Sequence, residues 1–550
     1  MPHHSKIFAP DILLSFAYCN IEHIVRSTII TVFKLNTASY NDAVGIERSM
    51  PKKPEKIRNS SKKKNTTLSK SLYIKGLQCH KALYLSKYHS DLKDEITAAQ
   101  EALFQQGHEV GRFAQQLFPG GVEILYEKNN YDAQVEKTQE AIKEGKKIIY
   151  EATFCFDGVF VKIDILKKGT KGWEIYEVKS STEIKDVHLN DTAIQYYVAL
   201  GSGLKVSKAG LVYINNKYVR VGDIQPDLLF TVEDRTRAIQ AQQADIPKKI
   251  ANIRKALCGD VPDIDIGEYC TKPYDCTFLG HCWKNIPPAS VFDLCGSKKK
   301  KFALYHSGIV LMADAPMAGL EHRQQFQLKA FLDRSKTINK PELKNFLKSL
   351  KYPICFLDFE TYSLAIPPFD GVRPYQKIPF QYSIHCINRD GATAKHFEYL
   401  TGNGEDPREI IATRLIQEIP ENACVVVYNK KFEKEILNNL KEWSPKYANR
   451  IDQLIENIRD LMDPFSDKHY YDWRMQGSVS IKKVLPVLIP AMSYEGMQVS
   501  NGSEAPLAYF KMSETHDAGE REKIRKDLLE YCKLDTFAMV KILEKLRKMV

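Results

Sequence analysis

From about residue 71 onwards, apolar and polar positions follow helical and strand periods in turn. The spacing in "AAQEALFQQGHEVGRFAQQLF" (98–118) predicts a helix, which "FPGG" ends. The predicted strands that follow cover 148–156, 159–166 and 173–179. The turn "KKGTKG" joins the last two as a hairpin, and a helix over 186–200 and a strand over 209–214 complete an αβββαβ order. We therefore expect an α/β domain over residues 71–290.

The rest of the chain divides into a helical part and a second α/β part. Residues 291–348 have helical periodicity, with "GSKKKK" (296–301) as an early break, and are expected to form a connector. Residues 349–550 contain the strand-like runs "ICFLDFE", "QYSIHCI", "HFEYL" and "ACVVVYN", and end in a Lys- and Leu-rich helix from about Glu520. Strands followed by closing helices predict a second α/β layer domain.

Charge is concentrated at the start of the chain. The net charge is +11, and residues 1–70 hold 12 Lys or Arg against 5 Asp or Glu, a net +7 that leaves +4 for the other 480 residues. Residues 48–70 offer almost nothing to bury, so we expect 1–70 to be a basic, disordered extension. Three roles are open for such an extension: a solvated tail, a phosphate-attracting arm or a targeting segment.

Neither a membrane span nor a secretory signal is recognisable in the chain. No apolar run reaches the ~18 residues of a span, and no basic start precedes a small-residue cleavage site. The 12 cysteines are spread too widely for a disulfide framework. We therefore expect a cytoplasmic protein in reducing surroundings, with no membrane partner.

Residues 71–290 place two acids and a lysine on neighbouring predicted strands. Glu177 and Lys179 are two apart on one strand, so both side chains leave the same face, and the hairpin brings Asp164 close to it. Two carboxylates can hold a divalent cation, and an ammonium group can orient an attacking water. The alternative is a solvated strand face, where Glu-x-Lys is common.

The order D-x12-E-V-K, followed by a helix bearing "QYY" (195–197), resembles the PD-(D/E)XK nucleases of the RecB type, including those associated with CRISPR systems. The resemblance implies a restriction-endonuclease-like αβββαβ core. In it, Asp164 and Glu177 would bind Mg²⁺ or Mn²⁺ and Lys179 would assist the attacking water. Gln195 would position substrate or metal-bound groups.

An earlier helix offers a further ligand for this site. RecB-type relatives usually place a histidine there, and His108 and Glu109 in "QGHEVGRF" are the candidates in this chain. The alternatives are an exposed helical histidine and a glutamate at a helix start.

Four cysteines of the same region form a second constellation. Cys270, Cys276 and Cys282 are spaced C-x5-C-x5-C, and Cys79 lies near the start of the domain. Four thiolates select an iron–sulfur cluster or zinc. The layout resembles the structural 4Fe-4S staple of RecB-type nucleases, which often space the last three as C-x2-C-x5-C. The longer first gap keeps zinc open as an alternative, and unligated core thiols are another.

In the last domain, the predicted strand "CFLDFETY" carries Asp358 and Glu360 on one face at its end. Two like charges that close need a cation between them, because otherwise one is driven to protonate. The alternative is an edge strand with two solvated acids.

Partners for these acids occur further along the chain. Asn429 and Glu433 follow the run "VVVY", where a strand is expected to enter a helix. Tyr531 and Asp535 are four apart on the final helix and therefore share a face. Together the four carboxylates would hold two cations, which clamp the attacking and leaving oxygens of a phosphodiester. Asp460 is a spare acid, for which a loop or helix-cap role is the alternative.

This second set resembles the DEDD exonucleases of the RNase H-like fold, with D-x-E first, N-x-x-F-acid second and Y-x3-D third. The tyrosine corresponds to the DEDDy branch, in which Tyr531 would orient the nucleophilic water. Glu433 stands where an aspartate is usual, and its extra methylene would either alter the metal spacing or abolish the second metal site. The last domain also resembles a bacterial uncharacterised family in which an RNase H-like unit follows a RecB-type one.

These patterns lead to one main hypothesis and one rival. The main hypothesis is a divalent-metal-dependent nuclease acting on DNA, or on RNA, with 3′–5′ exonuclease character in its last domain. Repair, recombination or defence proteins would be its partners, by resemblance alone. The rival is a nucleic-acid-binding or assembly protein in which one or both sites are inactive.

Overall fold

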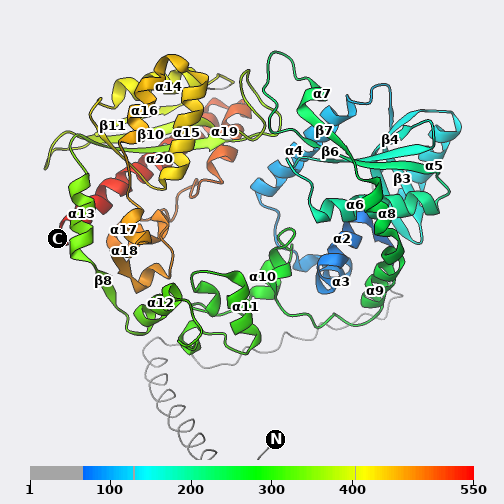
Figure 1. Ribbon diagram of the computed structural model, residues 1–550, viewed down its shortest axis with the longest axis horizontal. Coiled ribbons are helices and arrows are strands. Elements are labelled where there is room, and N and C mark those ends of the chain that lie inside the picture. The colour runs from blue at the N-terminus through cyan, green and yellow to red at the C-terminus, as the bar shows by residue number, and fades with distance from the viewer. Residues whose placement is uncertain (1–65, 128–129, 403) are drawn as a thin grey trace, which may run out of the picture. The chain divides into compact units, whose positions relative to one another are not determined.

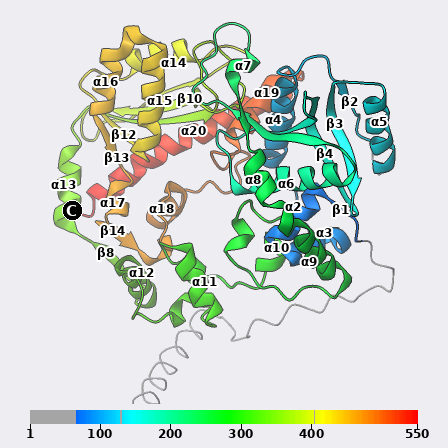
Figure 2. The same cartoon turned by 45° about the vertical axis from the view of Figure 1, so that its right-hand side comes forward.

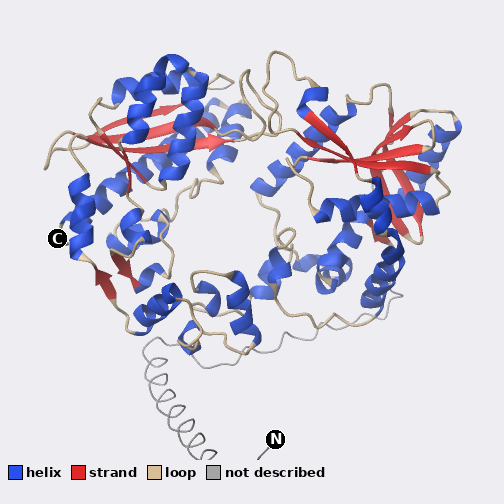
Figure 3. Cartoon of the chain, in the orientation of Figure 1, coloured by secondary structure: helices blue, strands red, loops and turns tan. Residues whose placement is uncertain are grey.

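The computed structural model describes residues 66–127, 130–402 and 404–550 (Figure 1). In this part the chain is mixed α/β, with sheets of seven, five and two strands (Figure 3). The expected extension lies outside the described residues up to position 65. None of the described helices is both long enough and apolar enough to cross a membrane.

The first sheet contains the strands expected between residues 71 and 290. Its strands are β1 (Leu68–Ser69), β2 (Val122–Glu123), β3 (Ile148–Phe156), β4 (Val159–Lys168), β5 (Trp173–Lys179), β6 (Val206–Ile214) and β7 (Phe230–Asp234). The order is β2-β3-β4-β5-β6-β7, with β1 beside β4. The strands predicted at 148–156 and 173–179 are confirmed residue for residue, and β4 continues two residues beyond its predicted end.

Helices cover both faces of this sheet. They are α2 (Lys70–Gln78), α3 (His80–Tyr88), α4 (Ala98–Gln115), α5 (Tyr131–Lys143), α6 (Asp186–Gly201), α7 (Pro226–Leu229), α8 (Thr236–Ala241), α9 (Ile246–Cys258) and α10 (Leu279–Trp283). Ile175 of β5 packs in a core with residues of α6, whereas its neighbour Tyr176 packs with Val110 and Ala114 of α4. Since successive strand residues point to opposite faces, α6 and α4 lie on opposite sides of β5.

Residues 68–70, which the sequence pattern assigns to the extension, belong to the fold. Leu68 is fully buried and pairs with Val159, and Lys70 begins α2 with Ser69 as its N-cap. One apolar residue among Lys, Ser and Thr is too short a signal to show periodicity.

The segment 291–348 contains α11 (Lys298–His306), α12 (His322–Leu332), β8 (Lys336–Ile338) and α13 (Lys340–Ser349). The break predicted at 296–301 is confirmed for Gly296 and Ser297 but is wrong from Lys298 onwards, because the lysines open α11 and Phe302 anchors it in a core. Lysine is a good helix former. In addition, β8 pairs with β14 (Tyr470–Asp472), so this connector shares a small sheet with the last domain.

The third sheet has the order β11-β10-β9-β12-β13. Its strands are β9 (Ile354–Tyr362), β10 (Ile378–Ile387), β11 (Lys395–Leu400), β12 (Cys424–Val427) and β13 (Ile458–Asp460). β9 is central, antiparallel to β10 and parallel to β12. The runs predicted as strands are confirmed.

The two faces of β9 meet different helices. Cys355, Leu357 and Phe359 pack with α14 (Arg408–Glu418), α15 (Lys430–Trp443) and α16 (Ala448–Glu456). The alternate residues Ile354 and Phe356 pack in a core with the other helices. These are α18 (Ile481–Leu488), α19 (Ala505–Glu514) and α20 (Ala518–Arg547), with the short α17 (Asp463–Ser466) beside them. Asp358 and Glu360 therefore face α20, which runs along the sheet in Figure 2.

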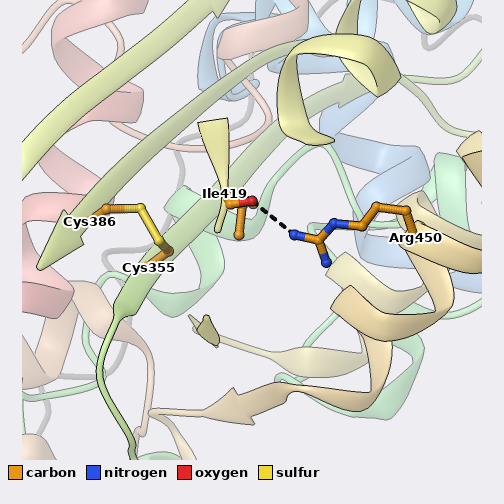
Figure 4. The surroundings of a disulfide bond; sticks show 4 residues. All are labelled: Cys355, Cys386, Ile419 and Arg450. Atoms are coloured by element: carbon orange, nitrogen blue, oxygen red, sulfur yellow. Dashed lines mark hydrogen bonds between the residues drawn. A yellow bond between two sulfur atoms is a disulfide. The ribbon is translucent and has the colours of Figure 1, made fainter. Parts of the chain in front are cut away.

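One disulfide joins two strands of this sheet. Cys355 of β9 and Cys386 of β10 lie directly opposite one another, with their Cα atoms 4.1 Å apart (Figure 4). On the same face, Arg450 of α16 donates a hydrogen bond of 2.8 Å to the carbonyl of Ile419. The nine other described cysteines are free. The expectation that the cysteines form no disulfide framework therefore has one exception, which strand register makes possible.

Burial of Leu68 predicts that the segment before α2 is part of the stability of the fold. Leu68→Ala should lower the free energy of unfolding by about 2–5 kcal/mol, because it removes a large side chain from a closed core. Urea denaturation measures this, and Leu103→Ala, the same change at a side chain 65% exposed on α4, is the control. Equal, small effects of the two substitutions would contradict the placement of β1.

Candidate functional site

Three carboxylates converge where β9 meets α20. Asp358 and Glu360 leave the same face of β9, and α20 brings Asp535 to them, so that one oxygen from each lies within 4.8 Å of the others. Glu360 and Asp535 are each 7% exposed. The sequence pattern named all three residues, and the structure brings them together.

Glu433 enters this group from α15. Its side chain is 1% exposed, and its Oε2 has no hydrogen-bond partner among the described residues. All four acids line one pocket, together with Asn429, Tyr531 and Lys482.

The turn from β12 into α15 explains how Glu433 reaches the pocket. Asn429 has a φ of +87°, which reverses the chain directly before the helix. Asp460 of β13 accepts hydrogen bonds of 3.0 Å and 2.8 Å from the backbone N–H groups of Asn429 and Lys430. Asp460 therefore caps α15, which confirms the helix-cap role given as the alternative for this residue. Asn429 contributes the turn.

Burial makes ionisation of these acids costly. Burial, followed by the charge of Asp535, raises the pKa of Asp358 well above its usual range, and burial does the same for Glu360 and Glu433. Burial also raises the pKa of Asp535 to about 6. Buried, like-charged oxygens with an unpaired Oε2 among them are the donor set that a hard divalent cation requires. The residues therefore fit Mg²⁺ or Mn²⁺.

Three polar side chains surround the acids. Tyr494 donates a hydrogen bond of 2.6 Å to Oδ1 of Asp535, which fixes that carboxylate. The ammonium group of Lys482 lies 3.3 Å from the Tyr531 hydroxyl and also donates to the carbonyl of Ser500. Burial lowers the pKa of Lys482, and the charges of nearby acids oppose this shift, namely Asp535, Glu360, Glu504 and Asp358. Tyr494 is a site residue that the sequence pattern did not reveal, because it lies outside every motif.

A second acid group lies at the ends of β4 and β5. The structure places Asp164 beside Glu177, and Oδ2 of Asp164 accepts a hydrogen bond of 2.7 Å from the backbone N–H of Val178. Glu177 is 2% exposed; Lys179 donates to its Oε1 at 2.7 Å, and the amide of Gln195 on α6 donates to its Oε2. The four residues predicted for this site are therefore adjacent.

Two further residues complete this second group. Lys70, the first residue of α2, donates to Oε1 of Glu177 at 2.8 Å, and Asp191 of α6 accepts from Lys179. Asp191 lies four residues before Gln195, so helical spacing could have revealed it. Lys70 could not be found this way, because its neighbours have the composition of a disordered segment.

The lysines determine the ionisation of this group. Burial would raise the pKa of Glu177, but the charges of Lys179 and Lys70 hold it well below its usual range. Burial and the charge of Glu177 raise the pKa of Asp164 to about 8. Unlike the group on β9, this one is internally neutralised.

His108 and Glu109 are not brought to this group. His108 is exposed on α4, and Glu109 lies in the middle of that helix and not at its start. Val110, the next residue, packs against the face of β5 that carries Tyr176, opposite the face that carries Glu177. The sequence motif indicated the helix correctly but not the sheet face that it covers.

The four cysteines predicted as a metal site line one small pocket. Cys79 lies between α2 and α3, Cys270 and Cys276 lie in the loop before α10, and Cys282 lies on α10. Burial raises the pKa of Cys276 to about 11 and raises those of Cys79 and Cys282 as well. Burial keeps these neighbouring thiols protonated, and a bound metal would stabilise them as thiolates instead. The four cysteines therefore fit a metal centre.

Two cysteines that are close to these in the sequence, Cys258 and Cys295, do not line this pocket. Cys258 is exposed at the end of α9.

Fold and acid groups together define a mixed α/β protein with buried carboxylate sites. A domain described as "Domain of unknown function (DUF2779)" matches residues 355–480, a range that includes Asp358, Glu360 and Glu433 but ends before Asp535.

Two relatives cover larger parts of the chain. It is similar to "Uncharacterized protein MG366 homolog" of Mycoplasma pneumoniae, with 28% identity over 246 residues, 41% of this chain and 37% of the relative. It is also similar to "Uncharacterized protein UU173" of Ureaplasma parvum, with 27% identity over 223 residues, 36% of this chain and 32% of the relative. The match therefore spans about a third of the length of each relative.

The raised pKa of Asp535 predicts how pH and metal act together on stability. A carboxyl group with a folded-state pKa above its unfolded value makes the fold lose stability as pH rises through that interval, here from 3.8 to about 6. A bound cation removes this loss. Mn²⁺ should therefore raise Tm several times more at pH 7.5 than at pH 5, as thermal unfolding in EDTA or Mn²⁺ measures.

The matched variants are Asp535→Asn, which should lose most of the pH-dependent gain, and Glu530→Gln, an exposed acid on the same helix that should keep it. An equal gain in Tm at both pH values would contradict a cation among these carboxylates.

Proposed function

We propose that this protein is a divalent-metal-dependent nuclease that hydrolyses phosphodiester bonds, with DNA as the substrate. The observation that carries the proposal is the convergence of Asp358, Glu360 and Asp535 within 4.8 Å in one pocket with Glu433 and Tyr531. The resemblance to DEDDy exonucleases names the same five residues. It also implies the RNase H-like character and the 3′–5′ direction proposed for residues 349–550.

Asp358, Glu360 and Asp535 would hold one ion, and Glu433 with Asp358 would hold a second. Bound cations supply a polarised nucleophilic water and stabilise the charge on the attacking and leaving oxygens. The buried, unpaired Oε2 of Glu433 supports its role as a ligand despite the longer side chain. Glu433 would then take the role of the aspartate that is usual in the DEDD exonucleases, which this domain resembles.

The remaining side chains orient the reacting groups. The Lys482 ammonium donates to the Tyr531 oxygen, so the hydroxyl hydrogen of Tyr531 would point towards Asp535 or towards an attacking water beside it. Tyr494 keeps Asp535 in one orientation through its short hydrogen bond. The charge of Lys482 would also attract a phosphate group that enters the pocket.

The group on β4 and β5 supports a second, RecB-type nuclease site. Asp164 and Glu177 would bind Mg²⁺ or Mn²⁺, Lys179 would orient water, and Gln195 holds Glu177 in place. This is the PD-(D/E)XK arrangement that the sequence resembles, on adjacent strands of a mixed sheet.

The spacing of the four thiols supports an iron–sulfur cluster over zinc. A zinc ion with Zn–S bonds of about 2.3 Å holds its tetrahedral sulfurs about 3.8 Å apart. Among the described residues, only the group on β9 and α20 has three ligand atoms within 4.8 Å of one another, so no three of these sulfurs approach that closely. Four irons at the corners of a cluster hold their cysteines further apart. The centre would be structural, because it joins α2 to the loop before α10.

A rival function has one specific observation in its favour. Both oxygens of Glu177 are occupied by side-chain donors, which favours a nucleic-acid-binding role for the first domain without hydrolysis. In that case only the site on β9 would cleave. Repair, recombination and defence against foreign DNA remain proposals from resemblance.

Nuclease activity is tested with labelled single- and double-stranded DNA and RNA in Mg²⁺ or Mn²⁺. Asp358→Ala and Lys179→Ala should each lower the cleavage rate of their own site by about a hundredfold or more, because ion and water lose their positions. The controls are Glu530→Gln, at an exposed position of α20, and Lys185→Ala, at an exposed position of the loop before α6. Loss of cleavage in one variant alone would assign the activity to that domain. No cleavage by the wild type would favour the binding protein.

Metal content separates cluster from zinc at the four cysteines. Protein purified without oxygen should contain about four irons per chain and absorb broadly in visible light. Cys276→Ser should lose the iron, whereas Cys258→Ser, at an exposed cysteine, should keep it. One zinc per chain and no iron would contradict the cluster.

A further inference from the structure

Lys70 is held in the acid group on β4 and β5 by the fold itself. Leu68, two residues earlier, is fully buried beside Val159, and Ser69 caps α2 by accepting a hydrogen bond from the backbone N–H of Leu72. The side chain of Lys70 is 22% exposed, and its ammonium group is 2.8 Å from Oε1 of Glu177. It is therefore a built part of the site.

Glu177 is already paired with two ammonium groups in this arrangement. Lys70 and Lys179 both donate to Oε1, and Gln195 donates to Oε2, so both of its oxygens are engaged. A cation on the same carboxylate would lie within a few ångströms of two ammonium groups, and that repulsion is strong in a buried site. One ammonium group must therefore leave before an ion binds Glu177.

The contacts indicate which lysine leaves. Lys179 is held in the site by two ion pairs, with Glu177 and with Asp191, and it lies on the same strand as Glu177. Among the contacts of the described residues, the hydrogen-bond partner of Lys70 is Glu177 alone, and Lys70 belongs to a different element. Burial lowers the pKa of Lys70, but the charges of Glu177, Asp191 and Asp164 outweigh this effect, so the pKa is raised overall.

We propose that Lys70 is the internal counter-cation of this site: its ammonium group stands in for a divalent ion on Glu177 and must be displaced for the ion to bind. The inference rests on the proposed function, because it concerns the metal of the RecB-type site. Lys70 then sets the concentration of free metal at which this site is loaded, whereas no lysine or arginine in the described part of the chain forms an ion pair with Asp358, Glu360, Glu433 or Asp535.

The test measures Mn²⁺ binding to the full-length protein with Asp358→Asn and Asp535→Asn, which removes the other acid group. Titration is followed by the electron paramagnetic resonance signal of free Mn²⁺, and Glu177→Gln identifies the binding that belongs to this site. Removing one competing ammonium group by Lys70→Ala should tighten Mn²⁺ binding about tenfold or more. Lys70→Met, which keeps the length of the side chain without its charge, should do the same and serves if the alanine variant does not fold.

Lys87→Ala is the matched control. The Lys87 ammonium donates to the carbonyl of Thr67 and so anchors the same segment, but it brings no charge to Glu177. If Lys70 were merely structural, both substitutions would loosen the segment and neither would tighten Mn²⁺ binding.

Unchanged or weaker binding in Lys70→Ala and Lys70→Met, with binding in the parent that Glu177→Gln abolishes, overturns the inference and leaves the proposed metal site intact. Binding detected only after removal of Lys70 supports the inference. If neither the parent nor the Lys70 variants bind Mn²⁺ in a way that depends on Glu177, the inference and the proposed first metal site both fall.

Discussion

Buried carboxylates within a few ångströms of one another cannot all carry charge unless a cation lies among them. The last domain is organised around this constraint. β9 is the central strand, its alternate residues fill the cores on both sides, and Asp358 and Glu360 take two positions on the face that α20 covers. Asp535 and Glu433 arrive from helices that begin far away in the chain. Packing forces the acids together, so at neutral pH the arrangement requires either protonation or the divalent cation that we propose for this site.

The chain solves the same electrostatic problem in two ways. On β5, two lysines neutralise Glu177, and the group needs no added ion to be stable. In the group on β9, Lys482 lies beside Tyr531, and within the described part of the chain Oε2 of Glu433 has no hydrogen-bond partner. If both groups bind metal as proposed, this difference would make them bind it at different concentrations. A protein with both would respond to the available metal one site at a time.

Local patterns predicted most of the strands, because alternation and apolar runs carry that information residue by residue. They also predicted Asp358, Glu360, Glu433 and Asp535 as a group, because the order of these motifs along the chain is typical of acids that a fold brings into one site. What they could not reveal depends on tertiary contacts. Lys70 hides in a segment of disordered composition, and His108 lies on a helix whose sheet face no local pattern specifies.

The pairing of β8 with β14 and the disulfide between Cys355 and Cys386 depend in the same way on strand register.

The proposal that a cation lies among Asp358, Glu360 and Asp535 is tested most directly by an anomalous-scattering map from crystals of the full-length protein soaked in Mn²⁺. A cation among these acids predicts a Mn²⁺ peak at about 2.0–2.4 Å from carboxylate oxygens of Asp358, Glu360 and Asp535. Carboxylates turned away from one another, or Mn²⁺ bound elsewhere with no peak among these three residues, would contradict it.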